Sequence, residues 1–253
     1  MDGLINFYKP PGLTSTQALY GVRKLTRQRK SGHAGTLDPI AEGVLVLCMG
    51  RATKLVELLM DHPKVYRATA RLDLTSESYD NEKDVKPVSV GAPPELGHVQ
   101  ATLRNYEGTI EQVPPALSAL KVRGRPAYRL SRAGKPPRLH PRPVTIYWTH
   151  LARFDYPMLE FEVACGRGTY IRALIRDIGE ELGTGGCLTG LVRQAIGPFR
   201  VDQSWTFERM EDASPNDYII PLERAREVLS QRPIPAPARP KPPPNTRDSR
   251  AGG

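Results

Sequence analysis

Strand-like and helix-like segments are interspersed along residues 1–231, and this order limits the possible folds more than any other feature. Hydrophobic spacing and turn residues indicate the type of each segment. The predicted strands are 3–8, 44–49, 65–72, 116–122, 144–154 and 159–165, with one more strand or turn near 188–195. The predicted helices are 17–30, 52–61, 96–106 and 170–182. Strands and helices do not alternate as strictly as in a doubly wound parallel sheet, so the sequence predicts an α+β fold.

The end of the chain differs in composition from the rest. Among residues 232–253, seven are proline, five are lysine or arginine and one is aspartate, which gives a net charge of +4. A segment so poor in apolar residues cannot bury enough surface to fold. We therefore expect one folded unit at 1–231 and a Pro-rich, basic, disordered tail at 232–253.

The whole chain is basic, with a formal net charge of +9 and a pI of about 9.6. Such an excess of positive charge predicts a polyanionic partner, although a solvated basic surface has the same composition. The longest apolar run, Val44–Met49, is far shorter than the roughly 20 residues that span a bilayer, so no membrane partner is expected.

The start of the chain and its cysteines bear on its compartment. We see no basic, apolar export signal at the N-terminus, and the three cysteines show no CxxC spacing. Both features predict a cytoplasmic protein with free thiols. The five histidines lack the spacing of a metal site, and no cofactor motif is present, so neither metal nor cofactor is expected.

The densest chemical signal is the segment Gly32-His33-Ala34-Gly35-Thr36-Leu37-Asp38-Pro39, which we expect to be a loop. Its two glycines allow a tight turn, and Pro39 keeps Asp38 out of the helical region. The loop therefore presents one rigid carboxylate that can act as a nucleophile or a base. An Asp-Pro pair alone is more often a simple turn. The position between a basic helix and a buried strand favours a site on a rigid scaffold.

A second segment, Cys165-Gly-Arg-Gly-Thr-Tyr-Ile-Arg172, contains a helix start at Gly168-Thr169. Tyr170 and Arg172 would then lie in the first turn of the helix. An arginine directed at Asp38 would keep that carboxylate charged and fix its direction. Spacing alone favours a surface arginine and a core tyrosine.

Five stretches of the sequence form a very specific combination. They are Lys9-Pro10-Pro11-Gly12, GHAGTLDPIAEGVLVLCMGRATKL at 32–55, Lys64-Val65-Tyr66-Arg67, Gly168-Thr169-Tyr170-Ile171-Arg172 and Gly190-Leu191-Val192-Arg193. In order and spacing they resemble the TruB family of pseudouridine synthases over roughly residues 3–205. The resemblance implies a catalytic domain at 1–231 with the pseudouridine synthase fold. That fold is a mixed, largely antiparallel central sheet with flanking helices and a thumb-like insertion, here at about 121–142.

The resemblance also implies an activity, which is isomerisation of one T-loop uridine of tRNA (uridine 55) to pseudouridine. The base must be flipped out of its stack, and the reaction needs no cofactor. The implied partner is the T-arm stem-loop of tRNA, bound by a monomer without a protein partner. The basic helix 17–30 and the basic segment 121–142 are the candidates for contacts with the RNA backbone.

Eight residues match positions with a role in the family. By this resemblance Asp38 is the catalytic aspartate, Tyr66 stacks on the target base and takes part in proton transfer, and Arg172 pairs with Asp38. The residues implied to bind substrate are His33 at the flipped nucleotide, Lys9 under the loop or at the RNA, Asp80 near the cleft, and Tyr170 and Leu191 in the pocket lining.

Two departures and two alternatives accompany the resemblance. Family members commonly carry a small C-terminal PUA domain, which we expect to be absent because the Pro-rich tail follows the matching region. The segment Asp73–Glu77 also differs from the Gly-rich sequence that is usual in the family. One alternative is a noncatalytic tRNA-binding or tRNA-folding protein on the same scaffold. The other is a guide-RNA-dependent relative, which normally needs extra domains.

Overall fold

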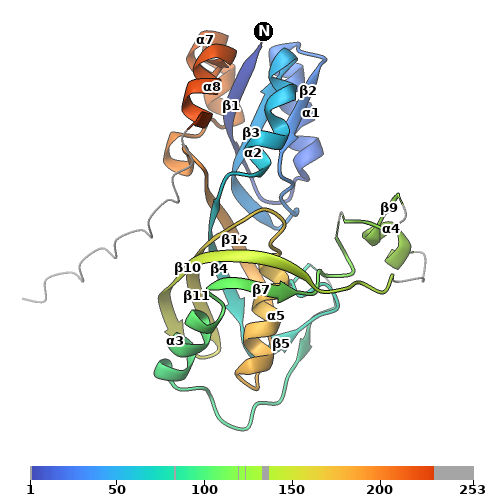
Figure 1. The fold of residues 1–253 in the computed structure, drawn as a ribbon, viewed down its shortest axis with the longest axis vertical. Coiled ribbons are helices and arrows are strands. Elements are labelled where there is room, and N and C mark those ends of the chain that lie inside the picture. Colours follow the sequence, from blue (N-terminus) through green and yellow to red (C-terminus); the bar gives the residue numbers. More distant parts are fainter. Residues whose placement is uncertain (1, 83, 119, 123, 133–136, 231–253) are drawn as a thin grey trace, which may run out of the picture.

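The computed structural model describes residues 2–82, 84–118, 120–122, 124–132 and 137–230. In this part of the chain ten strands form one large sheet (Figure 1). Its order is β14 (Ile220–Pro221), β1 (Gly3–Lys9), β3 (Ala41–Met49), β12 (Cys187–Ile196), β4 (Lys64–Arg71), β11 (Met158–Cys165), β10 (Arg142–Asp155) and β7 (Gly108–Gln112). Two further strands, β2 (Ser31–Ala34) and β13 (Phe199–Arg200), pair with β3 and β12. The predicted α+β class and the largely antiparallel sheet are confirmed.

Strand β3 joins two halves of the sheet. It pairs antiparallel with β1 along its length, and with β2 only at residues 46–49. At residues 41–43 it instead pairs in parallel with residues 191–193 of β12. We call β14, β1, β2 and β3 the upper half, and β12, β4, β11, β10 and β7 the lower half, as they lie in Figure 1. The three-residue contact between β3 and β12 is the seam between them.

Both faces of the upper half are covered, which explains the unbroken apolar run in β3. Val44 and Val46 face a core that includes α8 (Leu222–Ser230), whereas Leu45 and Leu47 face a core that includes α1 (Ser15–Thr26). A strand buried on both faces needs apolar residues at every position. The remaining elements of this half are the 3-10 helix η1 (Gly50–Leu55), α2 (Val56–Met60), the 3-10 helix η2 (Val201–Gln203), α6 (Phe207–Glu211) and α7 (Pro215–Tyr218).

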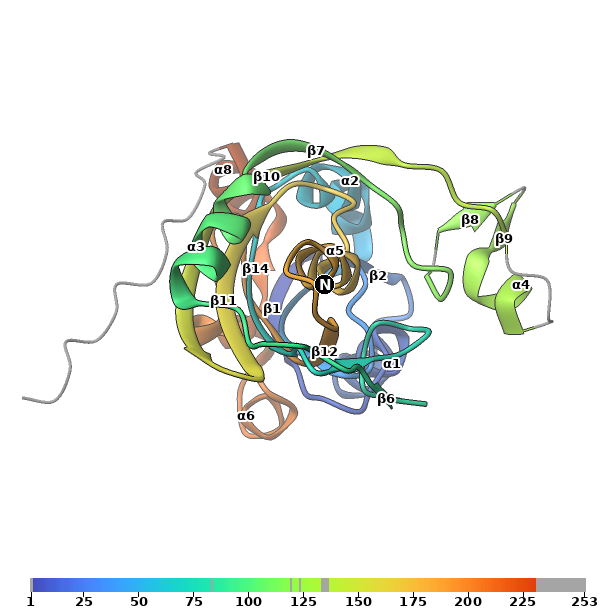
Figure 2. The ribbon, with the colours of Figure 1, turned by 90° about the horizontal axis from the view of Figure 1, so that it is seen from below.

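The lower half curves around one amphipathic helix. Figure 2 shows α5 (Ile171–Glu181) inside the curve of the lower strands. Its buried residues Leu174, Ile175 and Ile178 share a core with apolar residues of β4, β11 and β12. Helix α3 (Leu96–Asn105) adds Val99 and Leu103 to the same core. The predicted helices 96–106 and 170–182 therefore agree with the structure to within one or two residues.

Several predicted boundaries are wrong. The segment expected to be a loop at 31–39 begins with β2, and the helix expected at 52–61 is η1 followed by the short helix α2. The strand expected at 116–122 is confined to Lys121–Val122, named β8. The polar segment 73–94 is mostly loop, as predicted, with a small ladder between β5 (Leu74–Thr75) and β6 (Lys86–Pro87). Short strands gain their order from pairing partners, which local sequence does not reveal.

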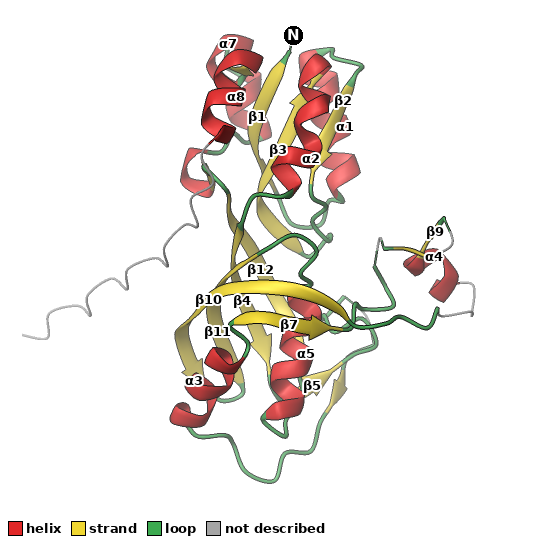
Figure 3. Ribbon diagram, viewed as in Figure 1, coloured by secondary structure: helices red, strands yellow, loops and turns green. Residues whose placement is uncertain are grey.

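Part of the predicted insertion is visible as a separate projection. Strands β8 and β9 (Arg125–Pro126) pair, and α4 (Ala127–Arg132) follows them. Figures 2 and 3 show this unit held away from the body by two connecting segments. The predicted tail at 232–253 falls outside the described residues. In the described residues, no helix is both long and apolar enough to cross a membrane.

Candidate active site

A cavity of about 760 Å³ lies beside the seam between the two halves. Its lining includes the loop before β3, the strands β4 and β12, and the segment that leads into α5. Five of the eight residues singled out in the sequence line it, namely Asp38, Tyr66, Tyr170, Arg172 and Leu191. Residues distant in sequence thus meet at one concave surface.

Asp38 and Arg172 form an ion pair at the wall of this cavity. The Arg172 Nε donates to Asp38 Oδ2 at 2.9 Å. The Asp38 side chain keeps 38% of its surface exposed, whereas the Arg172 side chain keeps only 5%. The carboxylate therefore faces the cavity while the guanidinium lies behind it.

The guanidinium of Arg172 is held from several directions. Nη1 donates to the Ser78 carbonyl at 2.8 Å, and Nη2 donates to the Leu117 carbonyl at 3.0 Å. Nη1 also lies 3.4 Å from Asp80 Oδ2. A planar guanidinium with five donors can satisfy all of these acceptors at once, which fixes its orientation.

Asp80 lies behind the cavity wall rather than in it. Its side chain is 3% exposed, and Ser78 Oγ donates to Asp80 Oδ1 at 2.6 Å. Asp80 therefore meets Arg172 and not the open cavity. The structure brings it to the site as a partner of the arginine, whereas the sequence indicated only a polar residue near the cleft.

Helix α1 helps to hold the loop that carries Asp38. Ser15, at the first position of α1, accepts a hydrogen bond from the Leu37 amide at 2.8 Å and donates to the Leu37 carbonyl at 3.0 Å. The same helix start is capped by Thr14 and Gln17, which form a capping box. The residue immediately before Asp38 is thus tied to a helix start.

Lys9 lies beneath the same loop. Its side chain is fully buried, and Nζ donates to the carbonyls of Pro10 at 2.8 Å, Leu13 at 2.6 Å and Pro39 at 3.4 Å. Burial, with the nearby charge of Arg193, lowers the pKa of Lys9 to about 8. Of the two roles considered for Lys9, this placement fits support of the loop, and it does not bring the side chain into the cavity lining.

Tyr66 and Leu191 form part of the wall opposite the loop. Tyr66 is 9% exposed, and burial raises the pKa of its hydroxyl. Leu191 is 7% exposed and lies on β12 at the seam, paired with Ala41. The two side chains present an aromatic ring and an aliphatic surface to the cavity.

Tyr170 is fixed by two groups that flank the predicted insertion. Its ring lies below the guanidinium of Arg142, with 5.2 Å from Cζ to the ring centre. Its backbone exchanges two hydrogen bonds with the buried side chain of Gln112, at 2.8 and 3.1 Å. Because Tyr170 precedes α5, these contacts set where the helix that carries Arg172 begins.

His33 is the eighth predicted residue, and it lies outside the cavity lining. It is on β2, opposite Leu47 of β3, and its Nδ1 is buried without a hydrogen-bond partner among the described residues. Burial and, secondarily, Arg193 lower the pKa of His33. A contact between His33 and RNA therefore stays a prediction.

Sequence reasoning missed three residues of the site. Gln112 lies on β7, a strand that the polar pattern did not reveal. Glu82 accepts a hydrogen bond from the Ile40 amide at 3.1 Å, beside the Asp38 loop, and burial with the charge of Asp80 raises the pKa of Glu82. Arg193 belongs to the segment 190–193 that resembles the family. Its burial in the cavity wall marks it as part of the site, and sequence spacing does not show burial.

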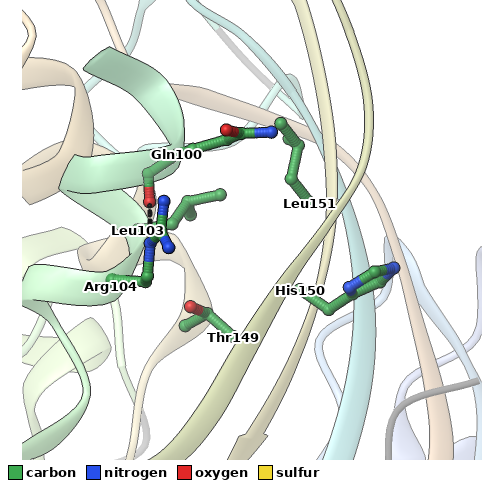
Figure 4. Close-up of a pocket in the computed structure, with 6 residues that line it drawn as sticks. All are labelled: Gln100, Leu103, Arg104, Thr149, His150 and Leu151. Carbon is green, nitrogen blue, oxygen red and sulfur yellow. Dashed lines mark hydrogen bonds between the residues drawn. The ribbon is translucent and has the colours of Figure 1, made fainter. Parts of the chain in front are cut away.

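A second, smaller hollow of about 280 Å³ lies between α3 and β10 (Figure 4). It is lined by Gln100, Leu103, Arg104, Thr149, His150 and Leu151. Arg104 Nε is taken up by the Gln100 carbonyl within the same helix, at 3.2 Å. This hollow contains none of the eight predicted residues and no carboxylate, so it is not the candidate site.

No metal site is found within the described residues, since no group of three or more His, Cys, Asp or Glu side chains could hold an ion. The three cysteines are free and buried. The ionisable side chains that line the cavity carry carboxylate, guanidinium, phenol and ammonium groups.

Sequence comparison matches two successive parts of the chain to one family. Residues 23–171 match the N-terminal domain of the TruB family pseudouridylate synthases, and residues 172–226 match the tRNA pseudouridylate synthase B C-terminal domain. A protein of Clostridium kluyveri named tRNA pseudouridine synthase B is 40% identical over 225 residues, which are 89% of this chain and 78% of that protein. A protein of the same name from Bacillus licheniformis is 42% identical over 240 residues, covering 90% and 77%.

Solved structures agree with this grouping. The matching chain of a Cbf5-Nop10-Gar1 complex superposes with a TM-score of 0.67 at 30% identity, covering 89% of this chain and 62% of that one. The matching chain of an archaeal box H/ACA sRNP Nop10-Cbf5 complex gives a TM-score of 0.62 at 29% identity, covering 83% and 53%. This chain therefore spans less than two thirds of either structural relative. By its sequence matches and its fold, the chain belongs to the TruB family of pseudouridine synthases.

Proposed function

We propose that this protein converts one T-loop uridine of tRNA, uridine 55, to pseudouridine, with Asp38 as the catalytic carboxylate. The observation that carries the proposal is the ion pair between Asp38 and Arg172 in the wall of a cavity large enough for a nucleoside. Relatives named tRNA pseudouridine synthase B, 40% and 42% identical to this chain, support tRNA as the substrate.

The reaction breaks the bond between ribose C1′ and N1 of uracil and makes a bond from C1′ to C5. No electron is gained or lost overall, so the conversion is an isomerisation. Atoms C1′, C5 and C6 are inaccessible in a stacked base, so the nucleotide must turn out of the RNA into the cavity. A volume of about 760 Å³ also leaves room for the detached uracil to rotate before it is rejoined.

Asp38 is placed to act on the flipped nucleotide. Its carboxylate is partly open to the cavity, and Arg172 fixes its direction from the protein side. Addition to C6, attack on C1′ and removal of a ribose proton all require an anionic oxygen held at one position. Fixing that oxygen before the substrate arrives avoids an entropic cost in the transition state.

Tyr66 and Leu191 shape the space for the base. An aromatic ring in contact with the flipped base offsets about 1–3 kcal/mol of lost stacking. Because burial raises the pKa of Tyr66, its hydroxyl is protonated at neutral pH and serves as a donor to the uracil. The aliphatic surface of Leu191 excludes water from the reacting centre.

Basic surfaces around the cavity suit an RNA backbone. Helix α1 carries Arg23 and Lys24 in its last turn, followed by Arg27, Arg29 and Lys30. The projecting unit 121–132 is also basic in sequence, and Leu120 and Arg142, on either side of it in the chain, line the cavity. Phosphate contacts of this kind supply affinity without reading sequence. We propose that the protein binds the T-arm as a monomer, without a guide RNA.

The test is to map pseudouridines in unmodified tRNA after incubation with the purified protein, alongside tritium release from [5-³H]uridine-labelled tRNA. We expect one new pseudouridine in the T-loop and release of its C5 tritium. The Asp38→Asn variant should release none, while its tRNA affinity stays within about tenfold, because phosphate contacts dominate binding. Binding by the wild-type protein without release would contradict the proposal and favour a tRNA-folding role. A requirement for added guide RNA on a bare T-arm stem-loop would contradict the guide-free mode.

A further inference from the structure

The cavity wall contains a buried cation to which the proposed function assigns no role. Arg193 on β12 is 1% exposed and is among the largest fully buried side chains. Among the described residues, none of the ion pairs includes Arg193. Burial of a charge without an ionic partner is unfavourable. We therefore expect Arg193 to have a role that compensates for this cost.

The guanidinium of Arg193 binds backbone on two segments of the upper half. Nε donates to the Val44 carbonyl of β3 at 2.7 Å. Nη2 donates to the Gly35 carbonyl at 3.0 Å, in the loop that leads to Asp38. The side chain thus reaches across the seam and holds the loop at Gly35, whereas Ser15 holds it at Leu37.

Arg193 also acts on the lower half, through Tyr66. The two residues are direct cross-strand partners on the antiparallel strands β12 and β4. Both side chains line the cavity, and the nearby Arg193 guanidinium opposes the rise in the pKa of Tyr66 that burial causes. One side chain therefore lies against both the loop of the proposed catalytic carboxylate and the proposed stacking tyrosine.

The backbone at Arg193 is fixed as well. Gly43 of β3 passes so close that a Cβ on it would lie 2.4 Å from the Arg193 carbonyl oxygen. This close approach belongs to the three-residue seam, where Gly43 and Arg193 are paired. The guanidinium consequently projects from an anchored point toward its three partners.

We propose that Arg193 is a positioning residue, which holds the Tyr66 hydroxyl in a fixed relation to Asp38 by binding both Tyr66 and the Asp38 loop. This inference rests on the proposed function of the site. Two carbonyl acceptors on separate segments, with the Tyr66 side chain beside them, suit the planar five-donor guanidinium, and the compact ammonium of lysine cannot replace it. The lowered pKa values of His33 and Lys9, to which Arg193 contributes, agree with a cation that is felt across the site.

The kinetic test is a double-mutant cycle with Arg193→Lys and Tyr66→Phe, measured by single-turnover pseudouridine formation at saturating T-arm stem-loop. We expect Arg193→Lys to lower the rate by about 100-fold, the size expected for a misplacement of about 1 Å, with RNA affinity changed less than about threefold. In the Tyr66→Phe background the same substitution should cost at least about tenfold less, because the two residues act as a unit. A normal rate for Arg193→Lys, or equal losses in both backgrounds, would overturn the proposal.

A second measurement covers the case in which Arg193→Lys does not fold. In ¹⁵N-labelled protein without RNA, the Arg193 Nε–H resonance should shift in Tyr66→Phe and stay unchanged in Tyr106→Phe, a partly buried tyrosine of the lower core. An unshifted Arg193 resonance in Tyr66→Phe refutes the contact. This measurement needs no turnover, so absence of pseudouridine in the wild-type reaction refutes the proposed function separately.

Discussion

The Gln112 side chain and the Tyr170 backbone form a reciprocal pair of hydrogen bonds across 58 residues of sequence. The amide oxygen accepts from the Tyr170 N–H, and the amide nitrogen donates to the Tyr170 carbonyl. The Tyr170 N–H and carbonyl lie at the start of α5, two residues before Arg172. The placement of the arginine thus depends on a side chain from the edge strand β7.

Gln112→Ala should therefore impair turnover, although Gln112 does not line the cavity. The Tyr170 N–H loses its acceptor, while the Tyr170 carbonyl keeps only the hydrogen bond from the Leu174 amide. We therefore expect a loss of about 1–3 kcal/mol in the free energy of unfolding and a fall of at least about tenfold in the single-turnover rate. Urea denaturation and rapid-quench kinetics measure the two effects. A matched control is Gln100→Ala on α3, which should leave the rate unchanged. Full activity of Gln112→Ala would show that Tyr170 is positioned by other contacts.

Arg172→Lys tests the fixed direction of Asp38. Lysine keeps the charge but cannot bind Asp38, Ser78 and Leu117 together, so we expect the single-turnover rate to fall by at least about 100-fold. The control Arg176→Lys lies one turn further along α5, pairs with Asp177 and does not line the cavity. It should lower the rate by less than about threefold. Equal losses in the two variants would mean that the ion pair has no special role.

Gly43→Ala should destabilise the protein by at least about 2 kcal/mol. The residue has φ of +98°, and its Cβ would lie 2.4 Å from a carbonyl oxygen that cannot move without parting the strands. Chemical denaturation measures the change. Gly91→Ala is the matched control, because a Cβ there meets nothing within 4 Å. Similar stabilities for the two variants would contradict the close approach at the seam.

The burial of Lys9 makes a prediction about pH. Burial lowers its pKa to about 8, below the ordinary lysine value of 10.5. Between these values the unfolded chain binds more protons than the native protein, so stability gains a term that rises with pH. The unfolding free energy of the wild type, relative to that of Lys9→Met, should therefore increase from pH 8 to pH 10.5 and be flat below pH 7. A relative stability that falls over the upper range would contradict the lowered pKa.

The extent of the sequence prediction follows from what local pattern encodes. The long strands 144–154 and 159–165 and the helix 170–182 carry strong periodicity, and the structure has them nearly as predicted. Strands β7 and β2 are short and largely polar, and they exist because a neighbouring strand pairs with each of them. The parallel contact of β3 with β12 joins segments about 150 residues apart, which no window of sequence displays.

The candidate site divides in the same way. Glycine and proline residues and the family resemblance marked the segments that contain Asp38, Tyr66 and Arg172. Gln112 and Arg193 act through burial and distant backbone partners, which only coordinates reveal. Glu82 lies in a polar stretch where its residue type carries no distinguishing signal. The sequence thus indicates side chains that line the cavity better than side chains that hold those residues in place.

The site is built from both halves of the sheet, which meet at the seam between β3 and β12. Asp38 comes from the upper half, and Arg172 and Tyr66 come from the lower half. Neither half on its own contains both members of the ion pair, so Asp38 and Arg172 meet only when the two halves are docked in register. A change in the register of this three-residue contact would therefore separate the two groups.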